Sequence, residues 1–281
     1  QGSYAMNTGI KPLGDGDYDI DVGIRFHVSI NGTYSDPTTL KALVRDVLQD
    51  HGGVPTIKRP CVTVDYPNDD YHVDLAIYAS AESNNNQNHL AKGYEGSSVD
   101  NKTWEPSDAE AFIKLVDERH DGPNGQQFRR VIRYLKRWKD HRFRSDGNEA
   151  PVGIGLTLNV YHAFVPDFDY RDGSPRDLLA LLKVVRLVLA DFATATHEEN
   201  GEIKEGRRLK ASIPVKPWDD VYDRMSNKQM EKFENRLKEL REALETAYGE
   251  IDPVDAAKIL QKQFGDDFPI PDPESNARKT S

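Results

Sequence analysis

The spacing of the apolar residues changes once along the chain, near residue 105, and this change limits the fold more than any other feature. Before it, residues 18–30 and 71–80 are rich in β-branched and aromatic side chains that alternate with other residues, as they do in half-buried strands. After it, apolar residues recur at helical spacing over most of the remaining chain. A sheet with helices that is followed by a helical region is typical of an α+β protein with two lobes.

Local signals predict further elements in both regions. A helix is expected over residues 37–49, after the start signal Ser35-Asp36-Pro37, and one more strand over residues 57–66. Residues 81–103 are polar, follow neither period and are interpreted as a surface loop. Later helices are expected to begin at a capping box or at a cap before proline, at Ser107, Ser174, Ser226 and Asp252. We therefore predict one domain over residues 1–105 and a second over residues 106–281.

Composition excludes several classes of protein. The formal net charge of −10 argues against a general nucleic-acid binder, because contacts with phosphates need clustered lysine and arginine. No apolar run approaches the roughly 20 residues that span a bilayer. The single cysteine, Cys61, excludes an internal disulfide framework and is expected to be a buried core residue of a cytoplasmic protein.

Residues 129–144 are an exception to the acidic balance, because they carry eight lysines and arginines against one aspartate, Asp140. Five apolar residues in and just before this segment form a stripe at helical spacing: Phe128, Val131, Ile132, Leu135 and Trp138. The cations therefore occupy the other faces of a predicted amphipathic helix. Most are expected to be solvated surface residues, although the stripe would suit a small polyanion such as a nucleoside triphosphate.

Three aspartates occupy positions that are expected to lie in strands. Asp19 and Asp21 are two residues apart, so their side chains project from one face of a strand at a separation of about 7 Å. Asp74 interrupts an otherwise apolar strand and would reach the same face if that strand were an antiparallel neighbour. Neighbouring carboxylates disfavour each other's charge unless a cation lies between them, and Mg²⁺ prefers oxygen ligands. The pattern predicts a two-metal site.

Each motif also has a structural explanation. Asp19 and Asp21 could belong with Asp15 and Asp17 to one solvated acidic edge or turn, although the third acid favours the metal site. His72 would face the same side as Asp74, but it is expected to be a partly exposed residue at a strand edge rather than a metal ligand.

Gly2 and Ser3 precede the acids by a distance that one loop can span. Glycine permits close approach of the backbone to a phosphate, and a serine hydroxyl can donate a hydrogen bond to it. A glycine–serine pair by itself is almost uninformative. Its position ahead of the acids is what favours a role in binding phosphate.

These residues resemble the cGAS/DncV-like nucleotidyltransferases (CD-NTases), which are bacterial relatives of cyclic GMP–AMP synthase and oligoadenylate synthetase in the polymerase-β-type superfamily. The similar segments are residues 1–6, 17–23, 72–78, 104–108 and 131–139. The resemblance implies an α+β fold, with a palm-type sheet over residues 1–105, a helical lobe like that of oligoadenylate synthetase over residues 106–281, and a nucleotide cleft between them. The family usually begins with a helix ahead of the glycine–serine motif, so upstream sequence is expected to be missing.

The resemblance also implies a role for each site residue. Asp19 and Asp21 would hold two Mg²⁺ ions, for which Mn²⁺ can substitute, and Asp74 would complete the ion that activates the acceptor hydroxyl. The donor phosphates would be bound by four residues: Gln1, Gly2, Ser3 and Lys136. Relatives often have a phosphate-binding serine after the basic helix, where residues 151–155 of this chain read Pro-Val-Gly-Ile-Gly. No serine is assigned there.

The implied activity joins nucleoside triphosphates, ATP among them, into a cyclic di- or trinucleotide second messenger, with release of pyrophosphate, in antiphage (CBASS-type) signalling. The alternatives are a linear oligoadenylate or terminal nucleotidyltransferase and a catalytically silent nucleotide-binding module. The expected enzyme is a cytoplasmic monomer that does not act at a membrane. A regulatory protein partner is expected as in some relatives, whereas the acidic charge disfavours activation by nucleic acid.

Overall fold

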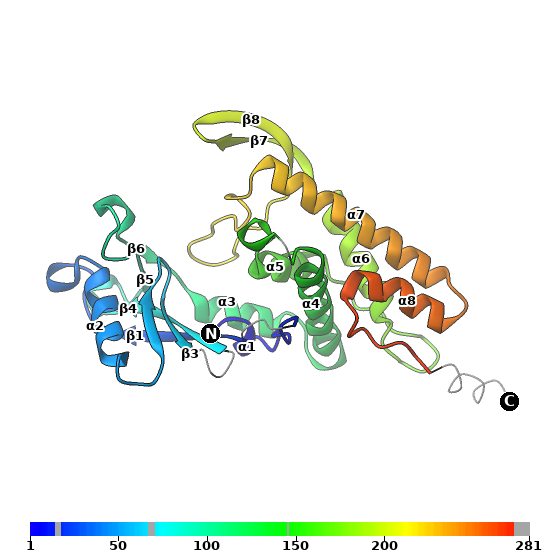
Figure 1. The fold of residues 1–281 in the computed structure, drawn as a ribbon, viewed down its shortest axis with the longest axis horizontal. Coiled ribbons are helices and arrows are strands. Elements are labelled where there is room, and N and C mark those ends of the chain that lie inside the picture. Colours follow the sequence, from blue (N-terminus) through cyan, green and yellow to red (C-terminus); the bar gives the residue numbers. More distant parts are fainter. Residues whose placement is uncertain (15–17, 67–70, 145, 273–281) are drawn as a thin grey trace. The chain divides into compact units, whose positions relative to one another are not determined.

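The computed structural model describes residues 1–14, 18–66, 71–144 and 146–272 of the chain. They form two compact units (Figure 1), one of Gln1–Glu118 with Ile213–Asp219 and the other of Arg119–Ser212 with Asp220–Ser281. The domains expected over residues 1–105 and 106–281 stay a prediction. Asp15 and Asp17, expected in a turn, lie outside the described residues. None of the helices within the described ranges is long and apolar enough to cross a membrane.

The first unit is a mixed sheet with helices, which confirms the predicted α+β class. Its strands are β1 (Tyr18–Phe26), β2 (Val54–Ile57), β3 (Val62–Tyr66), β4 (Tyr71–Ala79), β5 (His89–Lys92) and β6 (Thr103–Pro106). Its α-helices are α1 (Gly2–Ala5), α2 (Thr38–Leu48) and α3 (Ala109–Glu118). Its 3-10 turns are η1 (Gly32–Tyr34), η2 (Glu82–Asn84) and η3 (Val99–Asn101). Neighbouring strands in the order β2-β3-β4-β5-β6 are antiparallel, whereas β1 pairs with β4 in parallel.

Three expectations about this sheet were wrong. The strand expected over residues 57–66 is the hairpin β2–β3, whose turn is closed by the Lys58 N–H donating to the Cys61 carbonyl at 3.0 Å. The loop expected over residues 81–103 contains β5, which at four residues is too short to show a period. The strand beside β4 that carries the acid pair is parallel, not antiparallel.

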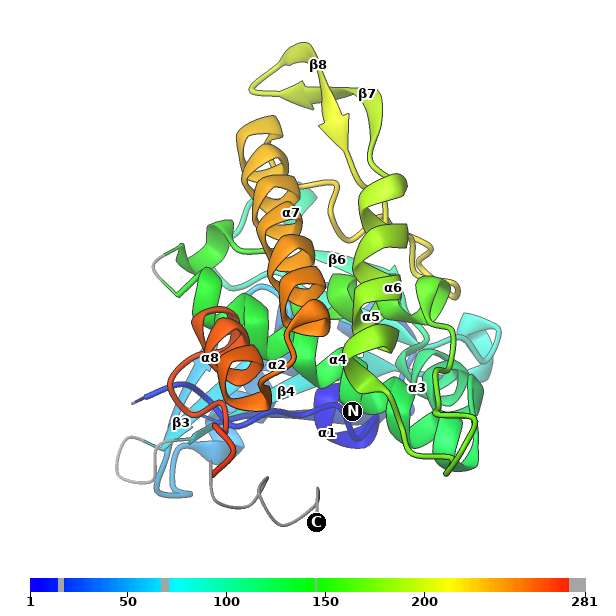
Figure 2. The same ribbon diagram turned by 90° about the vertical axis from the view of Figure 1, so that its right-hand side faces the viewer.

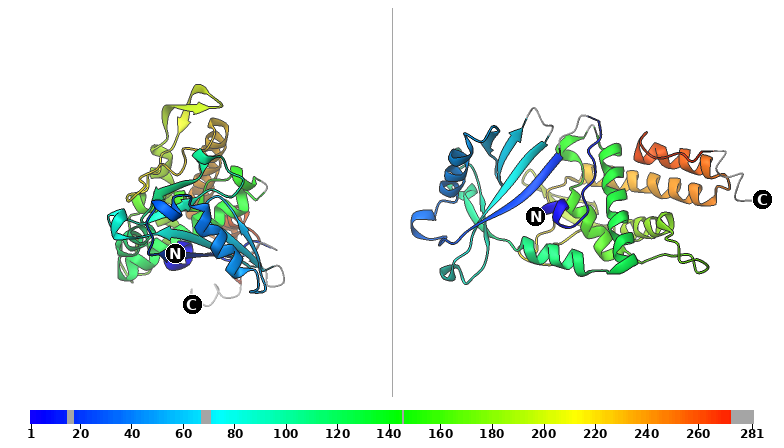
Figure 3. Two further views of the ribbon diagram at one scale, coloured as in Figure 1. Left: turned by 90° about the vertical axis from the view of Figure 1, so that its left-hand side faces the viewer. Right: turned by 90° about the horizontal axis from the view of Figure 1, so that it is seen from below.

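One face of the sheet is covered by α2 (Figure 3), which packs on β3, β4 and β5 through a core of Leu40, Val44, Val62, Val64, Leu75, Ile77 and Ala91. Leu75 and Ile77 alternate with Asp74 along β4, so burying them directs Asp74 to the opposite face. On β1, Ile20 and Val22 are 39% and 37% exposed, whereas Ile24 and Phe26 further along the strand pack against this core.

The second unit contains the α-helices α4 (Gly122–Arg142), α5 (Gly153–Ala163), α6 (Asp177–Ala190), α7 (Asn227–Gly249) and α8 (Pro253–Phe264), and the 3-10 turn η4 (Gly147–Glu149). The predicted apolar stripe of α4 is confirmed, since all five of its residues are buried. An antiparallel hairpin of β7 (Ala193–Glu199) and β8 (Glu202–Arg208) extends beyond α6 and α7 (Figure 2). This hairpin was not predicted, because β8 is mostly charged and has no apolar alternation.

Two of the predicted helix caps and one predicted helix are confirmed. Ser226 and Gln229 form the expected capping box at the start of α7. The Asp252 carboxylate accepts from the Val254 N–H at the start of α8. The helix expected over residues 37–49 is α2.

Two predicted starts were wrong. The carboxylate of Asp108, not the hydroxyl of Ser107, accepts from the Ala111 N–H at the start of α3. Ser174 and the proline after it precede α6 without opening it, since Pro175 bridges to Phe168 as an isolated β-pair. In both cases the expected cap residue is near the helix, but tertiary contacts determine where the backbone first turns.

Candidate active site

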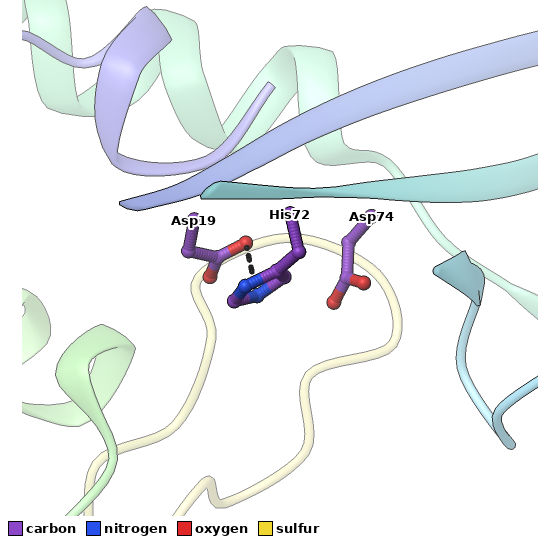
Figure 4. A group of neighbouring side chains, drawn as sticks. All are labelled: Asp19, His72 and Asp74. Carbon is purple, nitrogen blue, oxygen red and sulfur yellow. Dashed lines mark ion pairs between the residues drawn. The ribbon is translucent and has the colours of Figure 1, made fainter. Parts of the chain in front are cut away.

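The parallel pairing of β1 with β4 brings two of the predicted acids together. Asp19 lies beside His72 in the register, and Asp21 lies beside Asp74. The side chains of Asp19, His72 and Asp74 project to the same side of the two strands (Figure 4). Their potential ligand atoms all lie within 4.8 Å of one another. This group, which we call the acid–histidine cluster, has the composition of a metal site.

His72 differs from its expectation. It does not lie on an edge strand, because β4 pairs with β1 on one side and with β3 on the other. Its side chain is 25% exposed, and its Nε2 lies 3.4 Å from Asp19 Oδ1. The two-residue spacing between His72 and Asp74 already indicated that both side chains lie on one face of the strand. That His72 lies next to another acid depends on β1, the strand that pairs with β4.

Asp74 is held by its neighbour on the other side. The hydroxyl of Thr63 donates to Asp74 Oδ1 at 2.5 Å, and the two residues face each other in the β3–β4 register. Thr63 is completely buried, so this carboxylate oxygen has a fixed, dry partner. The Sγ atom of Cys61 lies 3.5 Å from the same hydroxyl, and burial raises the pKa of the thiol to about 11. Cys61 is thus a protonated core residue, as expected.

We predict that Thr63→Val weakens the binding of Mn²⁺ by about tenfold or more, because losing a group that orients a metal ligand typically costs 10- to 100-fold in affinity. The hydroxyl of Thr63→Ser should preserve the wild-type affinity. Isothermal titration calorimetry measures both variants. Unchanged affinity in Thr63→Val would show that Asp74 needs no such partner.

Electrostatics favour a cation in the cluster. Partial burial, with the nearby charge of Asp74, raises the pKa of Asp19, while His72 and Lys58 lower it less. A divalent ion among these groups would offset both unfavourable effects. The donor set of two carboxylates and one imidazole fits such an ion.

The raised pKa of Asp19 has a consequence for stability. The folded state binds this proton more readily than the unfolded chain does. Above the folded-state pKa, the ionised carboxylate therefore lowers the free energy of unfolding, and this loss becomes smaller as the pH decreases below that pKa. In EDTA at neutral pH, Asp19→Asn is therefore expected to raise the melting temperature slightly, with a smaller difference near pH 4. Differential scanning fluorimetry tests this. Saturating Mn²⁺ should reverse the order, because it stabilises only the protein that binds it.

The glycine–serine motif packs against the third predicted acid, Asp21. The main-chain nitrogen of Gln1 donates to the Asp21 carbonyl at 2.9 Å, and the Tyr78 hydroxyl donates to Gln1 Oε1 at 3.0 Å. Gly2 has φ +70°, and a Cβ atom there would lie 1.8 Å from Asp21 Oδ2. Only glycine therefore allows this approach, and Ser3 follows it in α1. The Asp21 carboxylate, lying against Gly2, is outside the acid–histidine cluster.

Lys136 belongs to the second unit, on α4. Its Cε atom lies 3.9 Å from the position of a Cβ atom at Gly153, the first residue of α5. The backbone amides that open this helix and the lysine would together suit an anion. Thr157 offers nothing similar, since its buried hydroxyl donates to the Gly153 carbonyl at 3.1 Å.

The basic stripe is not a continuous array of uncommitted cations. Within the described part of the chain, its ion pairs with acids of the second unit include Arg130 with Asp177, Arg137 with Asp267, Lys139 with Asp140, and Arg142 with Glu239. They weaken the interpretation of the whole stripe as a polyanion site.

Residues 1–78 match the family model described as "Cyclic GMP-AMP synthase DncV-like, nucleotidyltransferase domain". The fold is similar to that of the Vibrio cholerae DncV cyclic AMP-GMP synthase, with a TM-score of 0.66 and 20% identity over 96% of this chain and 68% of that chain. The match to the 3′-deoxy GTP bound form of Vibrio cholerae DncV has a TM-score of 0.69 and 20% identity, and it covers 96% of this chain and 67% of that chain.

The fold is also similar to that of the Bradyrhizobium diazoefficiens CD-NTase CdnG in complex with GTP, with a TM-score of 0.68 and 18% identity over 95% of this chain and 82% of that chain. At these identities the structural similarity shows a shared fold. The family model covers the segment that carries Gly2, Ser3 and the three aspartates.

Proposed function

We propose that this chain, whose residues 1–78 belong to the DncV-like nucleotidyltransferase family, joins nucleoside triphosphates into a cyclic di- or trinucleotide. The observation that carries the proposal is the acid–histidine cluster, which lies on the same sheet face as Asp21 behind the glycine–serine turn. In the reaction the hydroxyl oxygen of one nucleotide bonds to the α-phosphorus of another. The bond to the β-phosphate breaks, and pyrophosphate leaves. An antiphage signalling role is part of the proposal.

Each candidate residue would have a separate role in this reaction. The carboxylates of Asp19, Asp21 and Asp74 would hold one or two divalent ions, which when bound supply charge neutralisation at the reacting phosphate. Gln1, Gly2 and Ser3 would contact the donor phosphates through main-chain N–H groups and the serine hydroxyl. Lys136 would bind the triphosphate chain as a point charge. Such positioning and charge stabilisation supply most of the catalysis in phosphoryl transfer.

The proposal is tested by incubating the protein with Mg²⁺ or Mn²⁺ and all four radiolabelled nucleoside triphosphates. The expected product resists phosphatase and 3′-exonuclease, is identified by mass spectrometry, and is missing from the reaction of Asp19→Asn/Asp21→Asn. An exonuclease-sensitive product would instead identify a linear nucleotidyltransferase. If calorimetry finds that nucleotides do not bind in the presence of divalent ions, the result would favour the alternative of a catalytically silent module.

We predict that Gly2→Ala reduces product formation by about 10²-fold, because the new methyl group must displace the Asp21 carboxylate and an error of about 1 Å has a cost of this size. Gly32→Ala is the matched control. Gly32 has φ +73°, close to that of Gly2, but a Cβ atom there meets nothing within 4 Å. The control should show the backbone strain alone, with activity near that of wild type. Equal losses in the two variants would refute the role of the Gly2–Asp21 contact.

A further inference from the structure

The proposed function leaves His72 without a task, although its imidazole lies inside the acid–histidine cluster. We propose that His72 is a nitrogen ligand of the catalytic ion and makes the site prefer Mn²⁺ to Mg²⁺. This inference rests on the proposed function, since it concerns the same metal site. His72 would then be the residue that determines metal specificity.

The geometry is that of two neighbouring ligands of one ion. His72 Nε2 and Asp19 Oδ1 are 3.4 Å apart, which is longer than the 2.7–3.2 Å range of most N–H···O hydrogen bonds. Neighbouring ligands with metal–ligand bonds of about 2.0–2.2 Å lie roughly 3.0–3.5 Å apart. All the ligand atoms, including one from Asp74, are already within 4.8 Å of one another. Only small side-chain movements would close the group around an ion.

The sheet positions the imidazole. β4 is hydrogen-bonded to a strand on each side, so the backbone of His72 cannot shift freely. Asp74 is anchored through Thr63, and Asp19 lies directly beside His72 in the register. The three ligands therefore come from two adjacent, regular strands, and such elements hold ligands more accurately than loops do.

The chemistry of the donor atom determines the preference. Mg²⁺ is a hard ion that takes oxygen ligands and loses water reluctantly, so exchanging an oxygen ligand for an imidazole gains it little. Imidazole nitrogen binds divalent transition ions, and affinity along that series rises from Mn²⁺ to Cu²⁺. Mn²⁺ also accepts carboxylate and water ligands, so it suits the mixed donor set of two aspartates and one histidine.

The test uses the whole chain with metal alone, without nucleotide, in a buffer that lacks nitrogen. Electron spin-echo envelope modulation of bound Mn²⁺ is expected to show coupling to one directly bound nitrogen in the wild type and none in His72→Gln. Calorimetry should show that the ratio of the Mg²⁺ to the Mn²⁺ dissociation constant falls at least fivefold in His72→Gln. His89→Gln, a change of another partly buried histidine in the same sheet, should keep both the coupling and the ratio.

The outcomes separate the two proposals. If Asp19→Asn and Asp74→Asn abolish Mn²⁺ binding but the wild type shows no nitrogen coupling, the metal site stands and His72 is not a ligand. If the two aspartate variants bind Mn²⁺ as the wild type does, the proposed metal site itself is wrong. An unchanged metal preference in a folded His72→Gln would also overturn the inference.

Discussion

Replacing Asp74 by asparagine is expected to lower the rate of nucleotide joining by about 10³-fold. A metal ion held next to the reacting phosphate supplies several kcal/mol of stabilisation, and each 1.36 kcal/mol corresponds to about a factor of ten in rate. The amide of Asp74→Asn would keep an oxygen that accepts from Thr63, so the fold should be unaffected. Measuring the initial rate with labelled nucleoside triphosphates, together with the melting temperature, tests both parts of the prediction.

Asp65→Asn is the matched control for this substitution. Asp65 lies on β3 opposite His72 in the register, so its side chain projects from the same face as Asp74. It carries the same charge but does not belong to the acid–histidine cluster. Activity within about threefold of wild type is expected, since the change removes only a longer-range charge. A similar loss in both variants would mean that the net charge of this face, not the cluster, controls the reaction.

The largest effect on stability is expected from Lys41→Met. Lys41 is completely buried on α2, and its ammonium donates to the carbonyls of Lys58 at 2.5 Å, Arg59 at 2.9 Å and Gly93 at 2.6 Å. Methionine fills a similar volume but leaves three carbonyl groups without this donor. The Arg59 carbonyl would still accept from the Gly93 N–H at 2.9 Å, so the carbonyls of Lys58 and Gly93 are the two that lose their donor. Unsatisfied buried polar groups cost about 1–3 kcal/mol each, so we expect a loss of at least about 2 kcal/mol in the free energy of unfolding.

Urea denaturation followed by circular dichroism measures this loss. Lys114→Met is the control, since Lys114 lies on α3 of the same unit and its side chain is 72% exposed. Its Nζ atom is 3.9 Å from Oε1 of Glu118, which is a long distance for an ion pair. A pair so exposed contributes about 0.5 kcal/mol or less. If Lys41→Met were as stable as Lys114→Met, the carbonyls of Lys58 and Gly93 would have to find other donors, and the carbonyl contacts of Lys41 would not matter for the fold.

Several features of the candidate site follow from consecutive residues alone. The alternation of side chains along a strand places Asp19 with Asp21, and His72 with Asp74, whatever strand lies beside them. The same holds for the Ser226 cap, which needs only a glutamine three residues later. These features are predictable because each depends on residues within one turn or one short strand.

Other features depend on partners that are distant in the sequence. The parallel pairing of β1 with β4 places Asp19 beside His72, and the pairing of β3 with β4 places Thr63 against Asp74. A shift of one residue in either register would turn these side chains to opposite faces. The ion pairs that occupy much of the basic stripe on α4 are likewise formed with other segments, such as Asp177 on α6.

The sequence by itself therefore determined that this chain combines a sheet with helices and carries aspartates on shared strand faces. The tertiary structure decided which of these groups meet, how the Asp74 carboxylate is oriented, and that His72 belongs to the cluster. The physical reason is that side-chain alternation is local, whereas strand register is selected by the burial of a whole face, here the one that packs Leu75 and Ile77 against α2.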